Sequence, residues 1–135
     1  MKHKLIIIIF FCTLFLIVAC QTKTNETLLI ADMKDSSIIS GESTQIIIEV
    51  SNNGDVVLDG ELEIYSEDEE NVQIEYSDDE RISINLAPEE NIKRVIPVTG
   101  KTSSLRTDYL ITVNLIGSNK SILGSAKTVL IVKKE

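Results

Sequence analysis

The chain has 135 residues, with 13 Lys and Arg against 21 Asp and Glu, and a formal net charge of -8. A chain this acidic lacks the basic surface that nucleic acid or anionic lipid headgroups require, so we expect neither as a binding partner. The only histidine is His3, which leaves the rest of the chain without a Ser-His or Cys-His nucleophile pair and without the usual zinc or copper ligands. A carboxylate pair is formally possible, but it needs a cleft for which so small a domain has little room. A serine with a lysine base is also possible, but no spacing marks one. We therefore expect no cofactor and no enzymatic activity.

The first 19 residues have the composition of a secretory signal. Lys2 and Lys4 precede an apolar run over residues 5–19, which is typical of a charged n-region followed by an h-region. As a helix this run spans roughly 22 Å, which is shorter than the roughly 30 Å hydrocarbon core of a bilayer. We therefore expect a cleaved N-terminal signal helix over residues 1–19; the alternative is an uncleaved signal anchor.

The run ends in Ile17-Val18-Ala19-Cys20, which resembles the lipobox of bacterial lipoproteins, a motif that archaea share. The resemblance implies that Cys20 carries a diacylglycerol, that cleavage follows Ala19, and that Cys20 is the first residue of the mature chain. Two acyl chains are about what stable anchoring requires. The expected location is therefore the extracytoplasmic face of the cell membrane, with the protein lipid-anchored there.

Without residues 1–19 the mature chain has 116 residues, 11 Lys and Arg, 21 Asp and Glu, no histidine, and no cysteine besides Cys20. Its net charge is -10, and a disulfide framework is excluded. This length suits one domain with a real core. We expect a lipidated polar tether over residues 20–26 and a domain over residues 27–135.

From Thr27 onward, apolar and polar residues alternate with the period of two that is typical of half-buried strands. Turn residues separate the runs, and in Asn52-Asn53-Gly54-Asp55 we expect the positive φ that Asn and Gly accept. No helical period follows the signal. Eight short strands at regular spacing predict an antiparallel two-sheet β-sandwich; they are expected over residues 28–33, 43–50, 58–65, 71–76, 81–86, 92–98, 109–116 and 125–133.

Three short stretches resemble the CARDB and NEW3 families of immunoglobulin-like cell-surface domains. They are Gly41-Glu42-Ser43-Thr44-Gln45, Leu86-Ala87-Pro88-Glu89-Glu90 and Asp108-Tyr109-Leu110-Ile111-Thr112-Val113. The chain is similar also to the telokin-like group found in Gram-positive lipoproteins. The resemblance implies an all-β, immunoglobulin- or fibronectin-III-like sandwich of about 7–8 strands, a binding or spacing role at the cell surface, and no catalytic residues. Glu89 stands where these families usually place glycine, which argues against a positive-φ turn there.

Tyr109 lies at the start of a predicted strand, where a tyrosine corner is found in sandwiches of this kind. We expect its ring to be buried and its hydroxyl to bond the backbone near Leu105 or Arg106. The alternative is a tyrosine that faces a ligand.

Charge is distributed unevenly along the mature chain. Residues 20–90 hold 19 acidic and 3 basic residues, whereas residues 91–135 hold 2 acidic and 8 basic ones. The two halves either pair within one sandwich or form a dipolar surface that docks a charged partner or another copy. Two acidic runs flank one hairpin and are weak candidates for calcium, although neither matches an EF-hand loop; the residues are Glu67, Asp68, Glu70, Asp78 and Asp79.

Several apolar residues fall on the outward parity of their strands, and such a patch often marks an interface. If Tyr109 and Ile111 point inward, Leu110 and Ile116 point outward, and either Val129 and Ile131 or Leu130 and Val132 join them from the last strand. The alternative is that the strand over residues 92–98, the tether or a loop covers this face. The candidate interface is Tyr65, Leu110, Ile116, Val129 and Ile131.

The sequence as a whole indicates a membrane-anchored extracytoplasmic lipoprotein that acts as a non-enzymatic protein-interaction module. Its partner is either an unidentified protein or a second copy of the chain. Two further hypotheses are a structural or self-associating component of the cell envelope, and an accessory subunit that binds a cation or solute. Two glycosylation sequons, at Asn25 and Asn119, matter only in an organism that glycosylates asparagine outside the cell.

Overall fold

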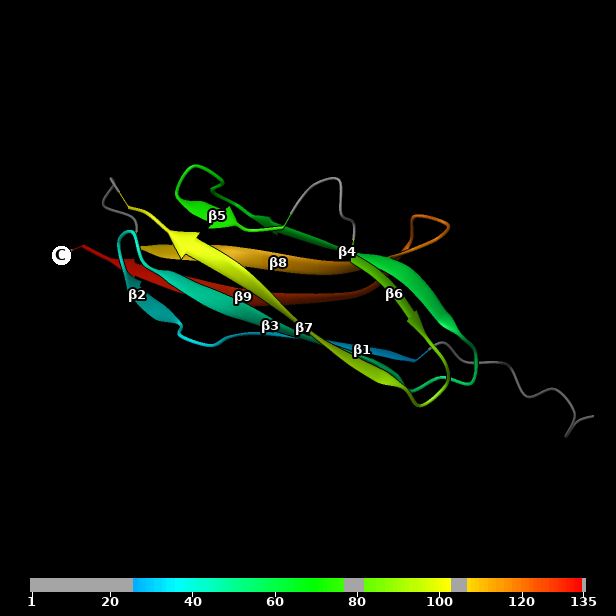
Figure 1. Cartoon of the computed structure of the whole chain (residues 1–135). Coiled ribbons are helices and arrows are strands. Elements are labelled where there is room, and N and C mark those ends of the chain that lie inside the picture. Colours follow the sequence, from blue (N-terminus) through cyan, green and yellow to red (C-terminus); the bar gives the residue numbers. More distant parts are fainter. Residues whose placement is uncertain (1–25, 77–81, 103–106, 135) are drawn as a thin grey trace, which may run out of the picture.

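Alternating apolar side chains fold the chain into two β-sheets packed face to face (Figure 1). The computed structural model describes residues 26–76, 82–102 and 107–134. The predicted signal segment, Cys20, Asn25, Asp78 and Asp79 lie outside the described residues. The strands are β1 (Thr27–Met33), β2 (Ser37–Ile39), β3 (Ser43–Asn52), β4 (Leu58–Ser66), β5 (Val72–Ile74), β6 (Ile82–Leu86), β7 (Asn91–Gly100), β8 (Asp108–Gly117) and β9 (Ile122–Lys133).

One sheet has four strands in the order β1-β3-β7-β5, and the other has five in the order β2-β9-β8-β4-β6. All pairs are antiparallel except β2 and β9, which run parallel. The predicted all-β sandwich is confirmed, and each of the eight expected strands is present. The prediction missed β2, because three residues are too few to show a period, and it began the last strand three residues late.

The core is formed by the side chains that each strand turns toward the other sheet. Along β3 the buried positions are Thr44, Ile46, Ile48 and Val50, every second residue. Such β-branched residues pack well on a pleated surface, which is why this run is a strand. The largest fully buried side chains come from both sheets: Tyr109, Ile46, Ile48, Ile84, Ile111, Leu115, Leu130, Val50, Val72, Val98, Val113 and Val132.

The strand expected over residues 92–98 is part of one continuous strand, β7, in the four-stranded sheet, and it contains Pro97. Ile96 and Val98 are buried on its inner face, whereas Val95 lies on the outer face and is 47% exposed. Strand β7 therefore belongs to the opposite sheet and does not cover the outer face of the five-stranded one.

The strands run roughly along the long axis of the sandwich, so the molecule has two distinct ends (Figure 1). Strand β1 begins at one end, and β9 finishes at the other. Between Glu26 and Lys134, leaving out the gaps at 77–81 and 103–106, no helix is long and apolar enough to cross a membrane.

Asn52, at the end of β3, connects four strand ends although it is 2% exposed. Its side-chain amide donates to the carbonyls of Val56 and Leu86 at 2.7 and 3.1 Å, and its Oδ1 accepts from the Gly54 amide at 3.1 Å. Its own backbone amide donates to Glu90 at 2.9 Å. One buried residue therefore joins the end of β3 to the starts of β4 and β7 and to the end of β6.

Left-handed backbone occurs at three described residues: Gly41 at φ 94°, Glu89 at φ 64° and Lys120 at φ 63°. Neither Asn53 nor Gly54 is among them, so the expected positive φ in that turn is wrong. The amide of Asn52 supports the turn by an Asx-type bond instead. At Glu89 the expectation was also wrong: the turn keeps the conformation that usually takes glycine, although the residue is Glu.

We expect Asn52→Ala to lower the free energy of unfolding by about 2–4 kcal/mol, because it leaves buried backbone groups of the loop and of β6 without partners. Asn53→Ala is the matched control, since Asn53 is exposed. Urea unfolding of both variants measures the difference. Equal stabilities would contradict the role assigned to Asn52.

We expect Glu89→Gly to raise the free energy of unfolding by about 0.5–1 kcal/mol, because glycine adopts positive φ without the Cβ clash that glutamate suffers. Glu90→Gly is the control, because Glu90 has no positive φ and its carboxylate accepts from the Ala87 amide at 2.8 Å. That variant should be destabilised. Thermal melting distinguishes the two, and a loss of stability in Glu89→Gly would refute the strained turn.

Candidate functional site

The outer face of the five-stranded sheet carries a cluster of exposed apolar side chains, here called the apolar patch. Leu110 on β8 lies directly opposite Val129 on β9. Ile131 continues along β9, and Tyr65 on β4 lies opposite Thr112, one row from Leu110. The exposed fractions of the patch are 39% for Ile39, 42% for Tyr65, 44% for Val129 and 38% for Ile131, and Leu110 is half-buried.

The structure resolves which residues of the last strand point outward. Leu130 and Val132 are fully buried, so Val129 and Ile131 form the outward pair. Ile39 is the one member that sequence reasoning missed, because it lies on the unpredicted strand β2. The only sequence signal was the apolar pair Ile38-Ile39, of which Ile38 is buried at 6% exposure and Ile39 faces outward.

Ile116 faces outward on β8, as predicted, but it is not adjacent to the apolar patch. It pairs with Ile122 across a bulge and with Glu61 on β4, at the other end of β8. Thr112 and Asn114 separate it from Leu110 along the same face. The alternation of residues correctly predicted that Ile116 lies on the outer face of the sheet. A strand of ten residues is nevertheless long enough to hold two separate apolar clusters on one face.

Charges of opposite sign border the face on the two neighbours of β8. On β4 the outward residues include Glu61 and Glu63, and on β9 they include Lys127 and Lys133. The acidic and basic parts of the sequence are thus brought to strands that flank β8. On the other sheet, Lys93 forms an ion pair with Glu49 at 3.0 Å.

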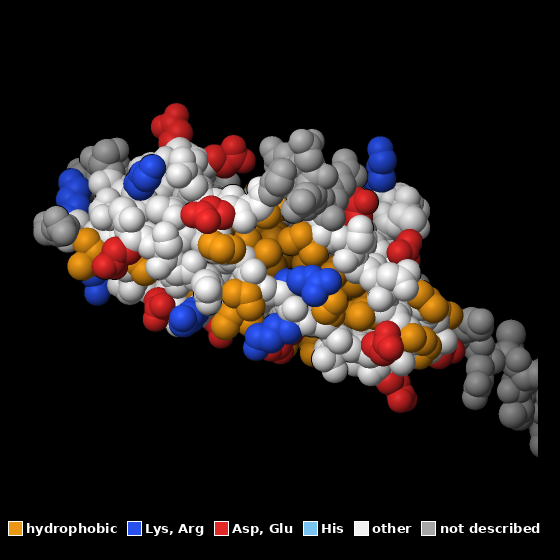
Figure 2. All heavy atoms as spheres, viewed as in Figure 1, with side chains coloured by type: hydrophobic (Ala, Val, Ile, Leu, Met, Phe, Trp, Pro, Cys, Tyr) orange, Lys and Arg blue, Asp and Glu red, His pale blue; other side chains and the backbone are white. Residues whose placement is uncertain are grey.

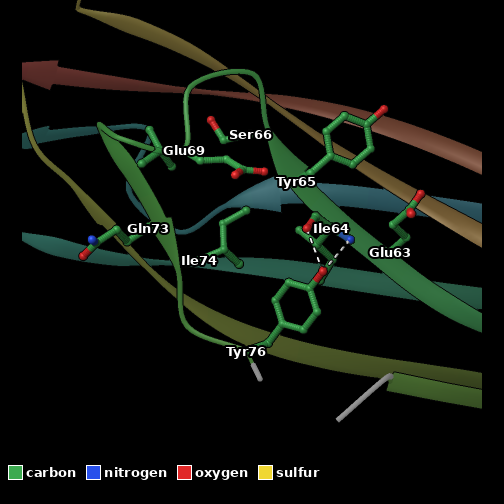
Figure 3. Close-up of a pocket in the computed structure, with 9 residues that line it drawn as sticks. Glu63, Ile64, Tyr65, Ser66, Glu69, Gln73, Ile74 and Tyr76 are labelled. Atoms are coloured by element: carbon green, nitrogen blue, oxygen red, sulfur yellow. Dashed lines mark hydrogen bonds between the residues drawn. The ribbon is translucent and has the colours of Figure 1, made fainter. Parts of the chain in front are cut away.

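A second feature is a cavity of about 640 Å³ at the side of the sandwich, between β4 and β5 (Figure 3). Hydrophobic side chains also gather in a hollow on this side of the molecule (Figure 2). In Figure 3 the ring of Tyr65 points away from Ile74 and Tyr76, in keeping with its place on the outer face. The cavity is lined by Glu63, Ile64, Tyr65, Ser66, Glu69, Val72, Gln73, Ile74 and Tyr76.

The hydroxyl of Tyr76 closes the edge of β4 beside this cavity. It donates to the Ile64 carbonyl at 2.9 Å and accepts from the Ile64 amide at 3.4 Å (Figure 3). Strand β6 pairs with β4 only as far as Leu62, so Ile64 lies just beyond the paired segment. The tyrosine takes the place of a strand partner there, which indicates a structural role for this side of the molecule.

The expected hairpin between the two acidic runs is not formed, because β5 lies in the four-stranded sheet and β4 and β6 lie in the five-stranded one. The acidic residues between β4 and β5 accept hydrogen bonds from nearby amides. Asp68 accepts from the Asn71 amide at 3.1 Å and from the Asn71 side chain at 3.0 Å, and Glu67 accepts from the Leu110 amide at 2.9 Å. Glu70 is exposed on the same turn. Within the described ranges, no three His, Cys, Asp or Glu side chains are grouped so as to hold a metal ion.

Tyr109 is fully buried, as the tyrosine-corner interpretation expects. Its hydroxyl donates to the Thr102 hydroxyl at 3.2 Å; the expected backbone partners, Leu105 and Arg106, lie outside the described residues. A ring with no exposed surface has no access to a ligand in solution. Asn119, in the turn between β8 and β9, is exposed, and its side-chain oxygen accepts from the Ser121 hydroxyl at 2.6 Å.

We expect Tyr76→Phe to lower the free energy of unfolding by about 1–2 kcal/mol, because both backbone groups of Ile64 lose their partner. Tyr65→Phe removes a hydroxyl from an exposed ring and should change stability by less than about 0.5 kcal/mol. Chemical unfolding of the two variants makes the comparison. Equal effects would show that the Tyr76 hydroxyl does not support the β4 edge.

No protein-family model matches the chain, and no curated protein matches it in sequence. Solved structures do match its fold. A CARDB domain from Pyrococcus furiosus, solved in complex with di-metal ions, aligns with a TM-score of 0.59 and 12% identity over 85% of this chain and 99% of that domain. A FixG-related protein from Vibrio parahaemolyticus aligns with a TM-score of 0.58 and 12% identity, over 82% of this chain and 99% of that one.

A fragment of native alpha-2-macroglobulin from Escherichia coli, spanning domain MG7 to the C-terminus, gives a TM-score of 0.62 and 13% identity. That match covers 83% of this chain and 17% of the fragment. At these identities the likeness concerns the fold alone. The chain therefore has a CARDB-like, immunoglobulin-type β-sandwich fold.

Proposed function

We propose that the mature chain is a lipid-anchored extracytoplasmic domain that binds a protein partner through the apolar patch. The observation that supports this proposal most directly is the apolar patch, in which Tyr65, Val129 and Ile131 are each at least 38% exposed on one face. Contiguous apolar surface of this kind on a soluble domain commonly marks a contact site. The domain would act by binding, without catalysis.

The composition of the face supports a protein as the partner. Tyrosine and large aliphatic side chains form the buried centre of protein interfaces, and a charged rim adds specificity and steers association. Here the centre is Leu110 and Val129, and the rim is Glu63 on one side and Lys127 on the other. A nucleic acid would meet an acidic strand, β4, on this face.

The lipid anchor is supported by the sequence. Residues 5–19 have the length of an h-region, and Ile17-Val18-Ala19-Cys20 resembles a lipobox. A tether of six residues between Cys20 and Thr27 reaches at most about 20 Å. The sandwich would then lie close to the membrane and meet partners that share that surface.

The alternatives receive less support. A role as a cation-binding accessory subunit would draw on the acidic residues between β4 and β5, but there Glu67 and Asp68 accept hydrogen bonds from backbone amides. The metal ions of the Pyrococcus furiosus CARDB domain belong to that protein. A self-associating envelope component would use the same apolar patch, so that alternative differs only in who the partner is.

The anchor is tested by replacing Cys20 with Ala in cells supplied with a clickable fatty acid. We expect the wild-type chain and Cys12→Ala to incorporate the label, because only Cys20 becomes the mature N-terminus. Cys20→Ala should incorporate none and should keep residues 1–19, as intact-mass measurement would show. Normal cleavage of Cys20→Ala, with the product still extractable only by detergent, would refute the lipoprotein assignment.

The contact surface is tested by Leu110→Asp and Val129→Asp in the full chain, with Val95→Asp as the matched control on the opposite sheet. We expect the first two to reduce chemical crosslinking to neighbouring proteins at least about 30-fold, the effect of losing a central contact residue. Val95→Asp should change it little. Crosslinking that survives both patch variants, or that falls equally in all three, would contradict the proposed surface.

A further inference from the structure

We propose that the partner of the apolar patch is a second copy of this chain, packed face to face about a two-fold axis that runs along β8. The inference rests on the proposed function, because it names the occupant of the same surface. It is carried by the order of the strands and by the signs of the charges on them. Two identical faces can close on each other only if they are complementary to themselves.

The face has opposite charges at equal distances from β8. Strands β4 and β9 are the two neighbours of β8 in the sheet. The outward side of β4 carries Glu61 and Glu63, and the outward side of β9 carries Lys127 and Lys133. The two halves of the face therefore carry opposite charges, while Asp108, on the outward side of β8 between them, would face its own copy across the axis.

A two-fold axis along β8 places β9 of each copy over β4 of the other. Lys127, Thr112 and Tyr65 occupy one row across the sheet, and Glu63 lies in the next row. The ammonium of Lys127 would thus meet the tyrosine ring and the Glu63 carboxylate of the second copy, a cation–π contact beside an ion pair. By symmetry each of these contacts is made twice.

The other two-fold axis in the plane of the face runs across the strands, and the charges disfavour it. That axis would place β9 over β9 and β4 over β4, so that the strand carrying the lysines faces its own copy, as does the strand carrying the glutamates. Like charges facing each other across an interface are strongly unfavourable. The charge pattern therefore selects the axis along the strands.

The selected axis also suits two chains anchored in one membrane. Rotation about an axis parallel to the strands keeps the start of β1 at the same end of both copies (Figure 1). Thr27, with which the sandwich begins after the predicted tether, then lies at the same end in both copies. Two copies held on one surface have a high effective concentration, so an interface of modest affinity is sufficient.

Leu110 is the residue of the patch on β8, and it lies close to the proposed axis. The test introduces Leu110→Cys into the full chain, in the membranes of the expressing cells, with a short bis-maleimide as the thiol crosslinker, because sheets packed face to face lie about 10 Å apart, too far for a direct disulfide. On the proposed function Cys20 is lipidated in the mature chain, so the new thiol is the only one available. We expect a crosslinked product of twice the chain's mass, and none from Val95→Cys on the opposite sheet.

Charge reversal then tests the pairing itself. Added to Leu110→Cys, either Lys127→Glu or Glu63→Lys should reduce the product about tenfold or more, because the reversed charge meets its own sign twice. Co-expression of the two reversed chains should restore the product as a mixed dimer, since each then meets the opposite sign. Thermal melting of each variant shows whether the fold is retained.

The outcomes separate the inference from the function on which it rests. A linked product of a different mass, containing another protein, would overturn the second copy as occupant and keep the apolar patch as a contact site. No linked product from folded Leu110→Cys would count against both. The proposed axis would be overturned if the two charge reversals left the dimer yield unchanged. It would also be overturned if co-expression of the reversed chains failed to restore the dimer.

Discussion

The buried amide of Asn52 is the constraint on which the arrangement of strands depends. It ends β3 in one sheet and donates to Leu86, which ends β6 in the other. It also bonds Val56, just before β4 starts. Because side chains alternate along a strand, the residue at which β4 starts decides which of its residues face the core. With Leu58 buried, Glu61 and Glu63 must face outward.

The burial of alternate residues of β8 decides in the same way which of its residues reach the outer surface. Strand β8 lies at the middle of the five-stranded sheet, and its inner face is filled by Tyr109, Ile111 and Val113, all fully buried. Burial of these residues requires that Leu110 face away from the core, where Val129 of β9 joins it. The apolar patch is thus a consequence of how the core is packed, while its exposure on a sheet that nothing in the described structure covers is what suggests a partner.

Periodicity was sufficient to predict the sandwich and the outward parity of Leu110, because both depend on local alternation of residue types. It could not decide between Val129 with Ile131 and Leu130 with Val132, because the last strand is apolar on both faces. It was not sufficient for β2, whose pairing joins Ile38 to Val132 across most of the domain. Alternation predicts which face a residue lies on but not how far apart two residues of that face lie in the patch. For this reason Ile116 was grouped with Leu110. The left-handed conformation of Glu89 was missed because tertiary bonds hold it there: its amide donates to the carbonyl of Asn52 at 2.8 Å.

We propose that the outer face of the five-stranded sheet is covered when the full chain is in the membranes of the expressing cells. Carbene footprinting with mass spectrometry measures that coverage on the unmodified protein, in membranes and after dispersal in excess detergent. Protection in membranes is predicted at Val129 and Ile131 but not at Leu28 and Val95, which are 48% and 47% exposed on the opposite sheet. Equal labelling of both faces in the membrane would contradict the claim.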